Sequence, residues 1–146
     1  MLRDPCLIPL SHQHHNALAL CVLPRRSLAA DGSPENLAKL ARRAIDRYEL
    51  ELANHFEIEE QVLFPACGEM APIALLVAEH RAMEGQIAQL RAAPTRALLE
   101  QFCTLLSEHI RREENGLFEQ IQRALPREAL DRAGSEIDRR AVRICL

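Results

Sequence analysis

Hydrophobic residues recur along most of this chain at steps of three and four, which is the spacing of one face of an α-helix. Such stretches cover residues 34–64, 72–92 and 95–124, and a shorter one begins near Ser11. None of them alternates between apolar and polar positions as a half-buried β-strand does. The pattern therefore predicts an all-α protein.

The breaks between these stretches carry residues that begin or end helices. Ser33 and Thr95 are suitable N-caps, and Pro34 and Pro72 suit the first helical turn. Ser11 is the candidate N-cap of the first helix. Since the connections are short, consecutive helices are expected to run antiparallel.

Three further prolines refine the expected boundaries. Pro24 is expected to kink or interrupt the first helix, and Pro65 to end the second. Pro126 precedes a weaker segment at 127–143, which is expected to pack outside as an accessory helix. The sequence thus predicts one domain over residues 1–146: an antiparallel up-down-up-down four-helix bundle at about 10–125 with an extra C-terminal helix.

Composition narrows the class of protein. The 146 residues are 48% hydrophobic and 27% charged, which fits one globular domain, and the net charge of −3 favours no nucleic-acid partner. No uncharged apolar run approaches the roughly 20 residues of a membrane span, and no signal peptide is evident. Five cysteines without a Cys-x-x-Cys pair indicate reduced thiols in the cytoplasm, mostly as small buried hydrophobes, with Cys145 the expected exception.

The strongest chemical signal is a duplicated decapeptide. Residues 55–64 and 109–118 both follow the pattern His-x-x-x-Glu-Glu-x-x-Leu-Phe. A histidine and the residue four positions later lie on one helix face, so His55 with Glu59 and His109 with Glu113 each pair a nitrogen with an oxygen donor. The leucines on the same face turn these pairs into the core, where a metal cation offsets the cost of a buried carboxylate.

The first and third helices each add one histidine to this set. His80 lies on the third helix, and residue counts along the rods place it at nearly the depth of His55 and His109. The first helix supplies His14 or His15. Helical periodicity favours His15, because Leu18 and Val22 follow it as Met83 and Ile87 follow His80. In the first hairpin the residue counts from the turn to each histidine match less well, a difference ascribed to a break at Pro24 and an extended loop.

Four imidazoles and two carboxylates are too many ligands for one tetrahedral zinc ion. They suit two octahedral first-row ions bridged by Glu59 and Glu113, for which iron is the natural choice. The Glu-x-x-His pattern of ferritin-like diiron proteins is absent. Glu60 and Glu114 are expected to lie off the metal face, and the four phenylalanines in the core, some of them at the ligand pocket.

The two decapeptides, the Glu79-His80 pair and the leading His-His resemble the hemerythrin-like (HHE cation-binding) family over about residues 10–125. The resemblance implies an antiparallel four-helix bundle with an oxo- or hydroxo-bridged pair of iron ions that reacts with dioxygen, nitric oxide or peroxide. The ligands that it implies are His15 or His14 and five further residues: His55, Glu59, His80, His109 and Glu113.

One departure from the oxygen-carrying members affects the expected function. They have a second histidine on the third helix, where this chain has Leu76 and Glu84 around His80. This leaves one iron with fewer ligands, or Glu84, His12 or water completes the set. The chain resembles more closely the members that repair iron–sulfur clusters, consume peroxide or sense oxygen and iron. A metal-dependent regulatory interaction module is the alternative. Whether the protein is an enzyme is left open, as is a homodimer through the outer helix.

Overall fold

The computed structural model describes residues 2–143, and that part of the chain contains no β-strand. A short 3₁₀ turn, η1 (Pro5–Leu7), leads into the first rod, α1 (Ile8–Ala30). The second rod runs without interruption through α2 (Pro34–Arg47), η2 (Tyr48–Leu52), α3 (Ala53–Ile58), η3 (Glu59–Leu63) and α4 (Phe64–Ala66). The third is α5 (Pro72–Ala92). The fourth joins α6 (Arg96–Arg112), η4 (Glu113–Leu117) and α7 (Phe118–Ala124), and α8 (Arg127–Arg140) follows.

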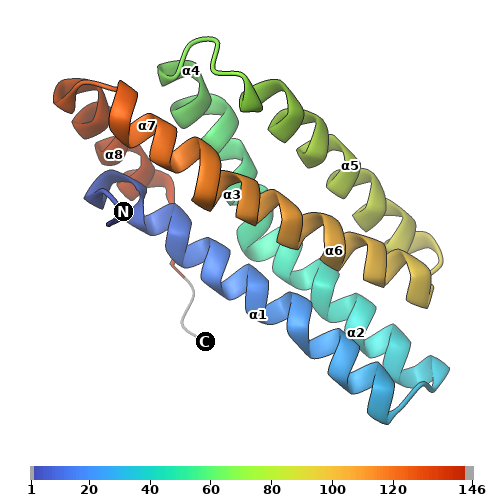
Figure 1. Ribbon diagram of the computed structural model, residues 1–146. Helices are drawn as coiled ribbons and strands as arrows, with labels where there is room; N and C mark the ends of the chain where they lie inside the picture. Colours follow the sequence, from blue (N-terminus) through green and yellow to red (C-terminus); the bar gives the residue numbers. More distant parts are fainter. Residues whose placement is uncertain (1, 144–146) are drawn as a thin grey trace.

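The first four rods form the bundle (Figure 1). α1 packs against α2 and α6, and α5 packs against the same two neighbours, so each rod contacts the rods before and after it around a ring. The connections at residues 31–33, 67–71 and 93–95 are too short to cross the bundle, which makes consecutive rods antiparallel. The predicted all-α bundle is confirmed.

The expected N-caps of the second and fourth rods are present. The Ser33 hydroxyl accepts a hydrogen bond from the Asn36 N–H at 3.2 Å, and the Thr95 hydroxyl accepts one from the Leu98 N–H at 3.1 Å. Pro34 and Pro72 lie in the first turns of their helices. These helix starts were therefore predictable from local capping chemistry.

The first rod differs from the prediction at Ser11, the expected N-cap, and at Pro24, the expected break. Helix α1 begins at Ile8, so Ser11 lies inside it, and the cap of the preceding η1 turn is Asp4, which accepts from the Cys6 N–H at 3.0 Å. Pro24 also lies inside α1 and does not interrupt it. One lost backbone hydrogen bond is outweighed by the packing of α1 against two neighbouring rods.

Three π-helical turns occur within the second and fourth rods, and nothing in the hydrophobic pattern predicted them. Two of these turns, η3 and η4, begin at the first glutamate of each decapeptide, Glu59 and Glu113. A π turn holds an extra residue, and such turns are frequent at functional sites. The third, η2, lies between Pro34 and His55 and accounts for part of the extra length that had been ascribed to Pro24.

Two apolar clusters fill the bundle. The distal cluster includes Ala17, Leu52, Met83, Phe102 and Ile110. The terminal cluster is built from the other end of the rods together with η1 and α8: Leu7, Leu10, Ile58, Leu76, Leu117, Leu130, Ala133 and Ile137 are among its members.

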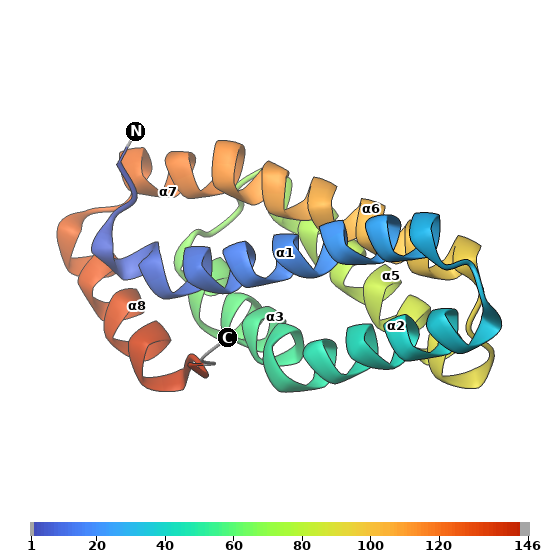
Figure 2. The same cartoon turned by 90° about the horizontal axis from the view of Figure 1, so that it is seen from below.

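Helix α8 is therefore not an accessory on the outside. It crosses the end of the bundle (Figure 2) and ends at Arg140, three residues before the expected boundary. Its buried face includes Ile137, and a β-carbon added to Gly134 would lie only 2.7 Å from Cβ of Cys6. Such close approach shows that α8 completes the terminal cluster.

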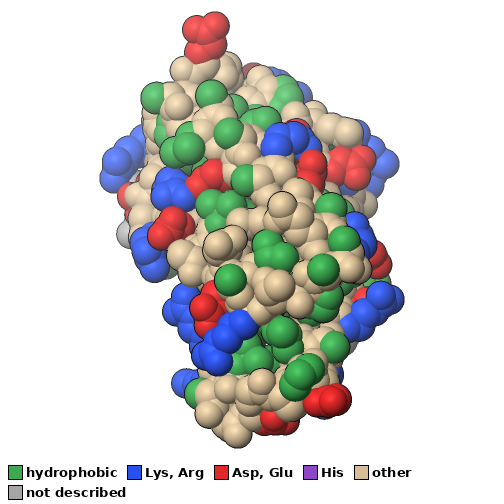
Figure 3. Space-filling view, turned by 90° about the vertical axis from the view of Figure 1, so that its right-hand side faces the viewer, with side chains coloured by type: hydrophobic (Ala, Val, Ile, Leu, Met, Phe, Trp, Pro, Cys, Tyr) green, Lys and Arg blue, Asp and Glu red, His purple; other side chains and the backbone are tan. Residues whose placement is uncertain are grey.

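The surface adds little to the picture of partners. On the face drawn in Figure 3, acidic and basic side chains are interspersed rather than gathered by sign. Among residues 2–143, no helix is both long and apolar enough to cross a membrane. Cys6, Cys21, Cys67 and Cys103 are free and buried, while Cys145 lies outside the described residues.

Candidate metal centre

Between the two apolar clusters lies one layer of buried polar side chains, to which each rod of the bundle contributes a histidine. The four are His14 on α1, His55 on α3, His80 on α5 and His109 on α6, and none is more than 2% exposed. Apart from Phe56 and Ile110, which directly follow a histidine, the buried apolar residues on one side of each histidine belong to the distal cluster and those on the other side to the terminal cluster. The histidines therefore lie at one depth.

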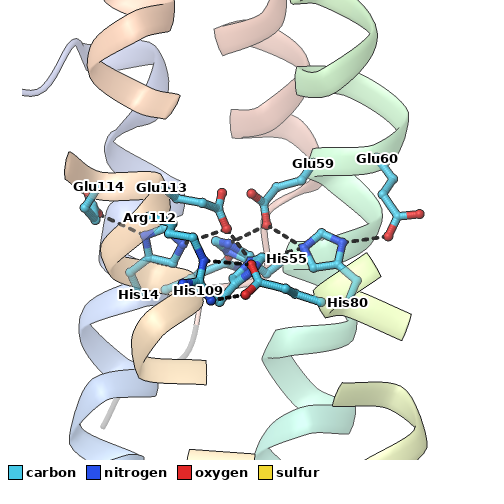
Figure 4. Close-up of polar contacts among 11 residues, drawn as sticks. His14, His55, Glu59, Glu60, His80, His109, Arg112, Glu113 and Glu114 are labelled. Carbon is cyan, nitrogen blue, oxygen red and sulfur yellow. Dashed lines mark hydrogen bonds and ion pairs between the residues drawn. The ribbon is translucent and has the colours of Figure 1, made fainter. Parts of the chain in front are cut away.

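Glu59 and Glu113 lie in this layer and are completely buried (Figure 4). An oxygen of Glu59 is 2.8 Å from Nε2 of His55 on its own rod and 3.5 Å from Nε2 of His80. Glu113 contacts His109 on its own rod in the same way, and its oxygen lies 3.9 Å from Nε2 of His14. Each carboxylate thus lies near the histidine of its own rod and near the histidine of one neighbouring rod.

These donors form two overlapping groups in which every ligand atom lies within 4.8 Å of the others. One group contains Glu59, His80, His109 and Glu113, and the other contains His14, His55 and Glu113. Since the groups share Glu113, their arrangement suits two neighbouring cations bridged by a carboxylate.

The outer nitrogen of every imidazole already has an acceptor. Each Nδ1 lies within hydrogen-bond distance of one oxygen: His14 with Glu114 at 3.0 Å, His55 with Gln13 at 2.9 Å, His80 with Glu60 at 2.7 Å and His109 with Glu79 at 3.1 Å. A carboxylate or amide oxygen only accepts, so Nδ1 carries the proton and Nε2 presents a lone pair. Such support is the usual surrounding of a metal-binding histidine.

The inner atoms, by contrast, lack partners within the described chain. Nε2 of His14 and of His55 and both oxygens of Glu59 and Glu113 are buried without a hydrogen bond of acceptable geometry. Nε2 of His80 and Nε2 of His109 face each other at 3.2 Å, a repulsive contact between lone pairs unless a cation or proton lies between them. Unpartnered buried polar atoms are costly, and here they converge, so the donor set fits bound metal.

The second glutamate of each decapeptide supports a histidine of another rod. Glu60 accepts from His80 and is itself contacted by Arg81, while Glu114 accepts from His14 and is held by Arg3 at 2.8 Å. The expectation that Glu60 and Glu114 lie off the metal face is confirmed. The His-x-x-x-Glu-Glu pattern therefore orients one carboxylate toward the metal and the next toward a neighbouring imidazole.

The protonation of the layer follows from its crowding. Burial and the charge of Glu59 raise the pKa of Glu113 to about 8. Burial acts to raise the pKa of Glu59 too, but His55 and contacts with Glu113 and His80 outweigh it and hold that pKa well below its ordinary value. Burial lowers the pKa of His109, yet Glu113, Glu59 and Glu79 reverse this and raise it to about 9. Without metal, the layer keeps protons in place of cations.

Aromatic rings enclose the layer. The ring of Phe56 stacks on His80 with centroids 4.0 Å apart, and Phe64 lies near the same imidazole at 5.9 Å. Phe118 stacks on His14 at 5.4 Å. Phe102 lies in the distal cluster and contributes to packing alone. Three of the four phenylalanines therefore form apolar walls around the donors.

The preference for His15 over His14 was wrong. His15 is exposed, while His14 is 2% exposed and lies among the donors. The periodicity that favoured His15 rested on Leu18 and Val22, which are 38% and 48% exposed, so it followed the outer face of α1. Because the first helix has apolar residues on both faces, local pattern alone could not choose.

The candidates for a further ligand lie elsewhere. His12 is exposed and lines a surface pocket, and Glu84 is paired with Arg81 on the outside of α5. Leu76 is fully buried in the terminal cluster and offers no donor atom. Within the described chain, the donors that come together are thus four imidazoles and two carboxylates.

Sequence reasoning missed the residues that hold the supporting oxygens. Gln13 accepts from His55, and Arg112 bonds to Glu79 through Nε at 3.2 Å. For Arg112, the feature of the sequence that could have indicated this contact is its position three residues after His109, about one turn further along the same helix. For Gln13 the only hint was a polar residue directly before a histidine.

The fold and the site together define a metal-binding four-helix bundle. The family model of the hemerythrin HHE cation-binding domain matches residues 9–121, so the chain belongs to this family. No curated protein and no solved structure gives a match in the other two comparisons. Membership in a cation-binding family agrees with the buried cluster of histidine and glutamate.

Proposed function

We propose that this protein binds two iron ions in the polar layer as a non-haem diiron protein and that it binds or reacts with a small oxidant such as dioxygen, nitric oxide or peroxide. The observation that carries the proposal is the pair of donor groups sharing Glu113. Mixed imidazole and carboxylate donors suit iron, and their number exceeds the need of one tetrahedral zinc ion. The ligands would be His14, His55, Glu59, His80, His109 and Glu113.

The chain's own residues prepare this layer for a small molecule. Iron, when bound, supplies a redox-active Lewis acid. The supporting oxygens fix each imidazole with Nε2 inward, and Phe56, Phe64 and Phe118 exclude bulk water. Because Leu76 adds no donor, six ligands would not fill the coordination of two octahedral ions, and a small molecule could occupy an open coordination position.

The metal content of the reconstituted protein tests the proposal directly. After anaerobic loading with ferrous iron and removal of excess, elemental analysis should give two iron ions per chain. Oxidation should then produce the near-ultraviolet charge-transfer absorption of a bridged ferric pair. Fewer than one iron per chain after reconstitution would contradict the proposal.

The class of reaction is tested by mixing the diferrous protein rapidly with each oxidant. A reversible spectral change with dioxygen is expected of a carrier, whereas fast turnover with peroxide or nitric oxide is expected of a stress-defence protein, including an iron–sulfur repair factor. The proposal favours defence or sensing over carriage, because the donor set lacks a fifth imidazole. No reaction with any of the three would remove the oxidant from the proposed function.

A metal-dependent regulatory module is a second candidate, supported by contacts between the site and the segment after α8. Asn54, next to His55, accepts from the Val142 N–H and donates to the Arg140 carbonyl, both at 3.0 Å. Limited proteolysis should then cut this segment faster without iron than with it. Equal patterns would eliminate the candidate. We also place the protein in the cytoplasm, as its four described cysteines are free thiols.

A further inference from the structure

The centre is built from one local pattern used twice. In each use, the second glutamate of a decapeptide accepts from the histidine of a rod that carries no decapeptide: Glu60 from His80 on α5 and Glu114 from His14 on α1. The first glutamate of each decapeptide lies beside the histidine of its own rod. The α1 and α5 rods therefore play equivalent parts, as do the second and fourth rods.

The remaining pair of contacts breaks this equivalence. The residues directly before His14 and His80 each accept the Nδ1 proton of a decapeptide histidine. On α5 this residue is Glu79, which accepts from His109 at 3.1 Å, and on α1 it is Gln13, which accepts from His55 at 2.9 Å. A charged carboxylate supports one imidazole, and a neutral amide supports its counterpart.

The surroundings of the two residues match their charges. Arg112, three residues after His109, bonds to Glu79, while the position three residues after His55 is Ile58, an apolar residue 1% exposed. Gln13 instead donates from Nε2 to Asn54 at 3.2 Å and to the Val142 carbonyl at 3.3 Å. These two acceptors fix the amide with its oxygen toward His55. The neutral partner is thus built into the fold.

Gln13 also lines a pocket of about 400 Å³ whose wall includes the buried Glu51 and the exposed His12 and His15. The amide that supports His55 therefore borders this surface pocket. His12 and His15, the leading histidines that do not reach the centre, line the same pocket.

We propose that Glu79 and Gln13 make the two metal positions unequal, so that the ion held by His80 and His109 binds tightly and the ion held by His14 and His55 is the weaker, exchangeable one. A carboxylate on Nδ1 raises the donor strength of Nε2 more than an amide does, and such supporting contacts change metal affinity by about 10- to 100-fold. The inference rests on the proposed function in requiring two ions.

Cobalt(II) titration of the metal-free protein against a competing chelator tests this inference. The wild type should bind two ions in two steps separated by at least about tenfold. Glu79→Gln should weaken the tight step by about 10- to 100-fold and bring the two together, since Arg112 is partly exposed and can turn to solvent. Gln13→Glu should strengthen the weak step, a gain that structural damage cannot produce. Glu100→Gln, an exposed change on α6, is the control and should alter neither step.

Variants of the metal ligands show which binding step belongs to which metal position. His55→Ala should remove the weak step and His109→Ala the tight one. Two indistinguishable steps in the wild type, or a separation that Glu79→Gln leaves unchanged, would overturn the inference while two ions still bind. Binding of fewer than two ions by the wild type would instead overturn the proposed function. If Gln13→Glu does not fold, Glu79→Gln decides alone.

Discussion

The polar layer and the apolar clusters on either side of it are built from the same rods but have opposite energetic roles. The distal and terminal clusters bury leucine, isoleucine and phenylalanine side chains, each of which stabilises the fold by about 1.5–3 kcal/mol. The layer buries six donor atoms that lack partners within the described chain, and each such atom costs roughly 1–3 kcal/mol. Fold stability and metal binding are therefore located in adjacent but separable parts of the molecule.

The largest expected effect on the layer comes from the shared carboxylate. Glu113→Gln should reduce the metal content from two ions to at most one, because the amide cannot bridge two cations as a carboxylate does. The metal-free variant should keep its melting temperature, since Glu113 with a pKa of about 8 already carries a proton at neutral pH and glutamine resembles that form. Elemental analysis and thermal unfolding measure the two quantities. A metal-free variant that unfolds far below the wild type would show that the layer supports the fold.

In the distal cluster, by contrast, a substitution is expected to lower the stability of the fold without changing metal binding. Phe102→Ala removes a fully buried ring and should lower the free energy of unfolding by about 3–5 kcal/mol. Its folded fraction should still bind two ions, because Phe102 belongs to the distal cluster and lies about two helical turns before His109. Urea denaturation measures the stability, with Leu50→Ala as a control at a 59% exposed site that should change it by less than about 0.5 kcal/mol. Loss of metal in folded Phe102→Ala would mean that the two regions are coupled.

A matched pair of glycines tests whether α8 belongs to the terminal cluster. Gly134→Ala should destabilise the protein by about 1–3 kcal/mol, since its β-carbon would meet the Cys6 backbone and side chain. Gly85→Ala, in α5 with no atom within 4 Å of the added carbon, should stabilise by up to about 1 kcal/mol through helix propensity. Thermal unfolding compares them. Equal shifts of the same sign would place α8 outside the core, as the sequence had suggested.

The difference between the two regions also explains what the sequence could predict. Helix starts at Ser33 and Thr95 depend on a few neighbouring residues, so capping chemistry located them. The grouping of His55, Glu59, His109 and Glu113 followed from a spacing of four residues on one helix face.

Features set by tertiary packing were not predictable in this way. The continuation of α1 through Pro24 and the burial of α8 depend on neighbouring rods, and nothing local signals them. The choice between His14 and His15 depends on which face of α1 meets the bundle, and exposed Leu18 and Val22 misled the periodicity. The partners of Nδ1, such as Gln13 for His55, come from other rods and are visible only after folding.

The protonation of the layer gives the last and mildest test, because pH should move stability and metal binding in opposite directions. Glu113 and His109 have folded pKa values raised to about 8 and about 9, above the ordinary 4.5 and 6.5. A raised pKa stabilises the fold fully below the ordinary value, and that stabilisation is lost as pH rises through the folded value. The metal-free protein should therefore lose stability between about pH 5 and pH 9.

Metal binding must displace the same protons, so the affinity for cobalt(II) should rise by about tenfold per pH unit for each proton released, up to about pH 9. Titrations at pH 6, 7 and 8, with the released protons counted in weak buffer, measure this slope. Glu113→Gln cannot release its share, so whatever metal it binds should show the shallower dependence that His109 alone provides. A slope that is the same in the two proteins would mean that Glu113 holds no proton in the metal-free layer, and the cost of the layer would then have to be ascribed to unpaired carboxylate charge rather than to trapped protons.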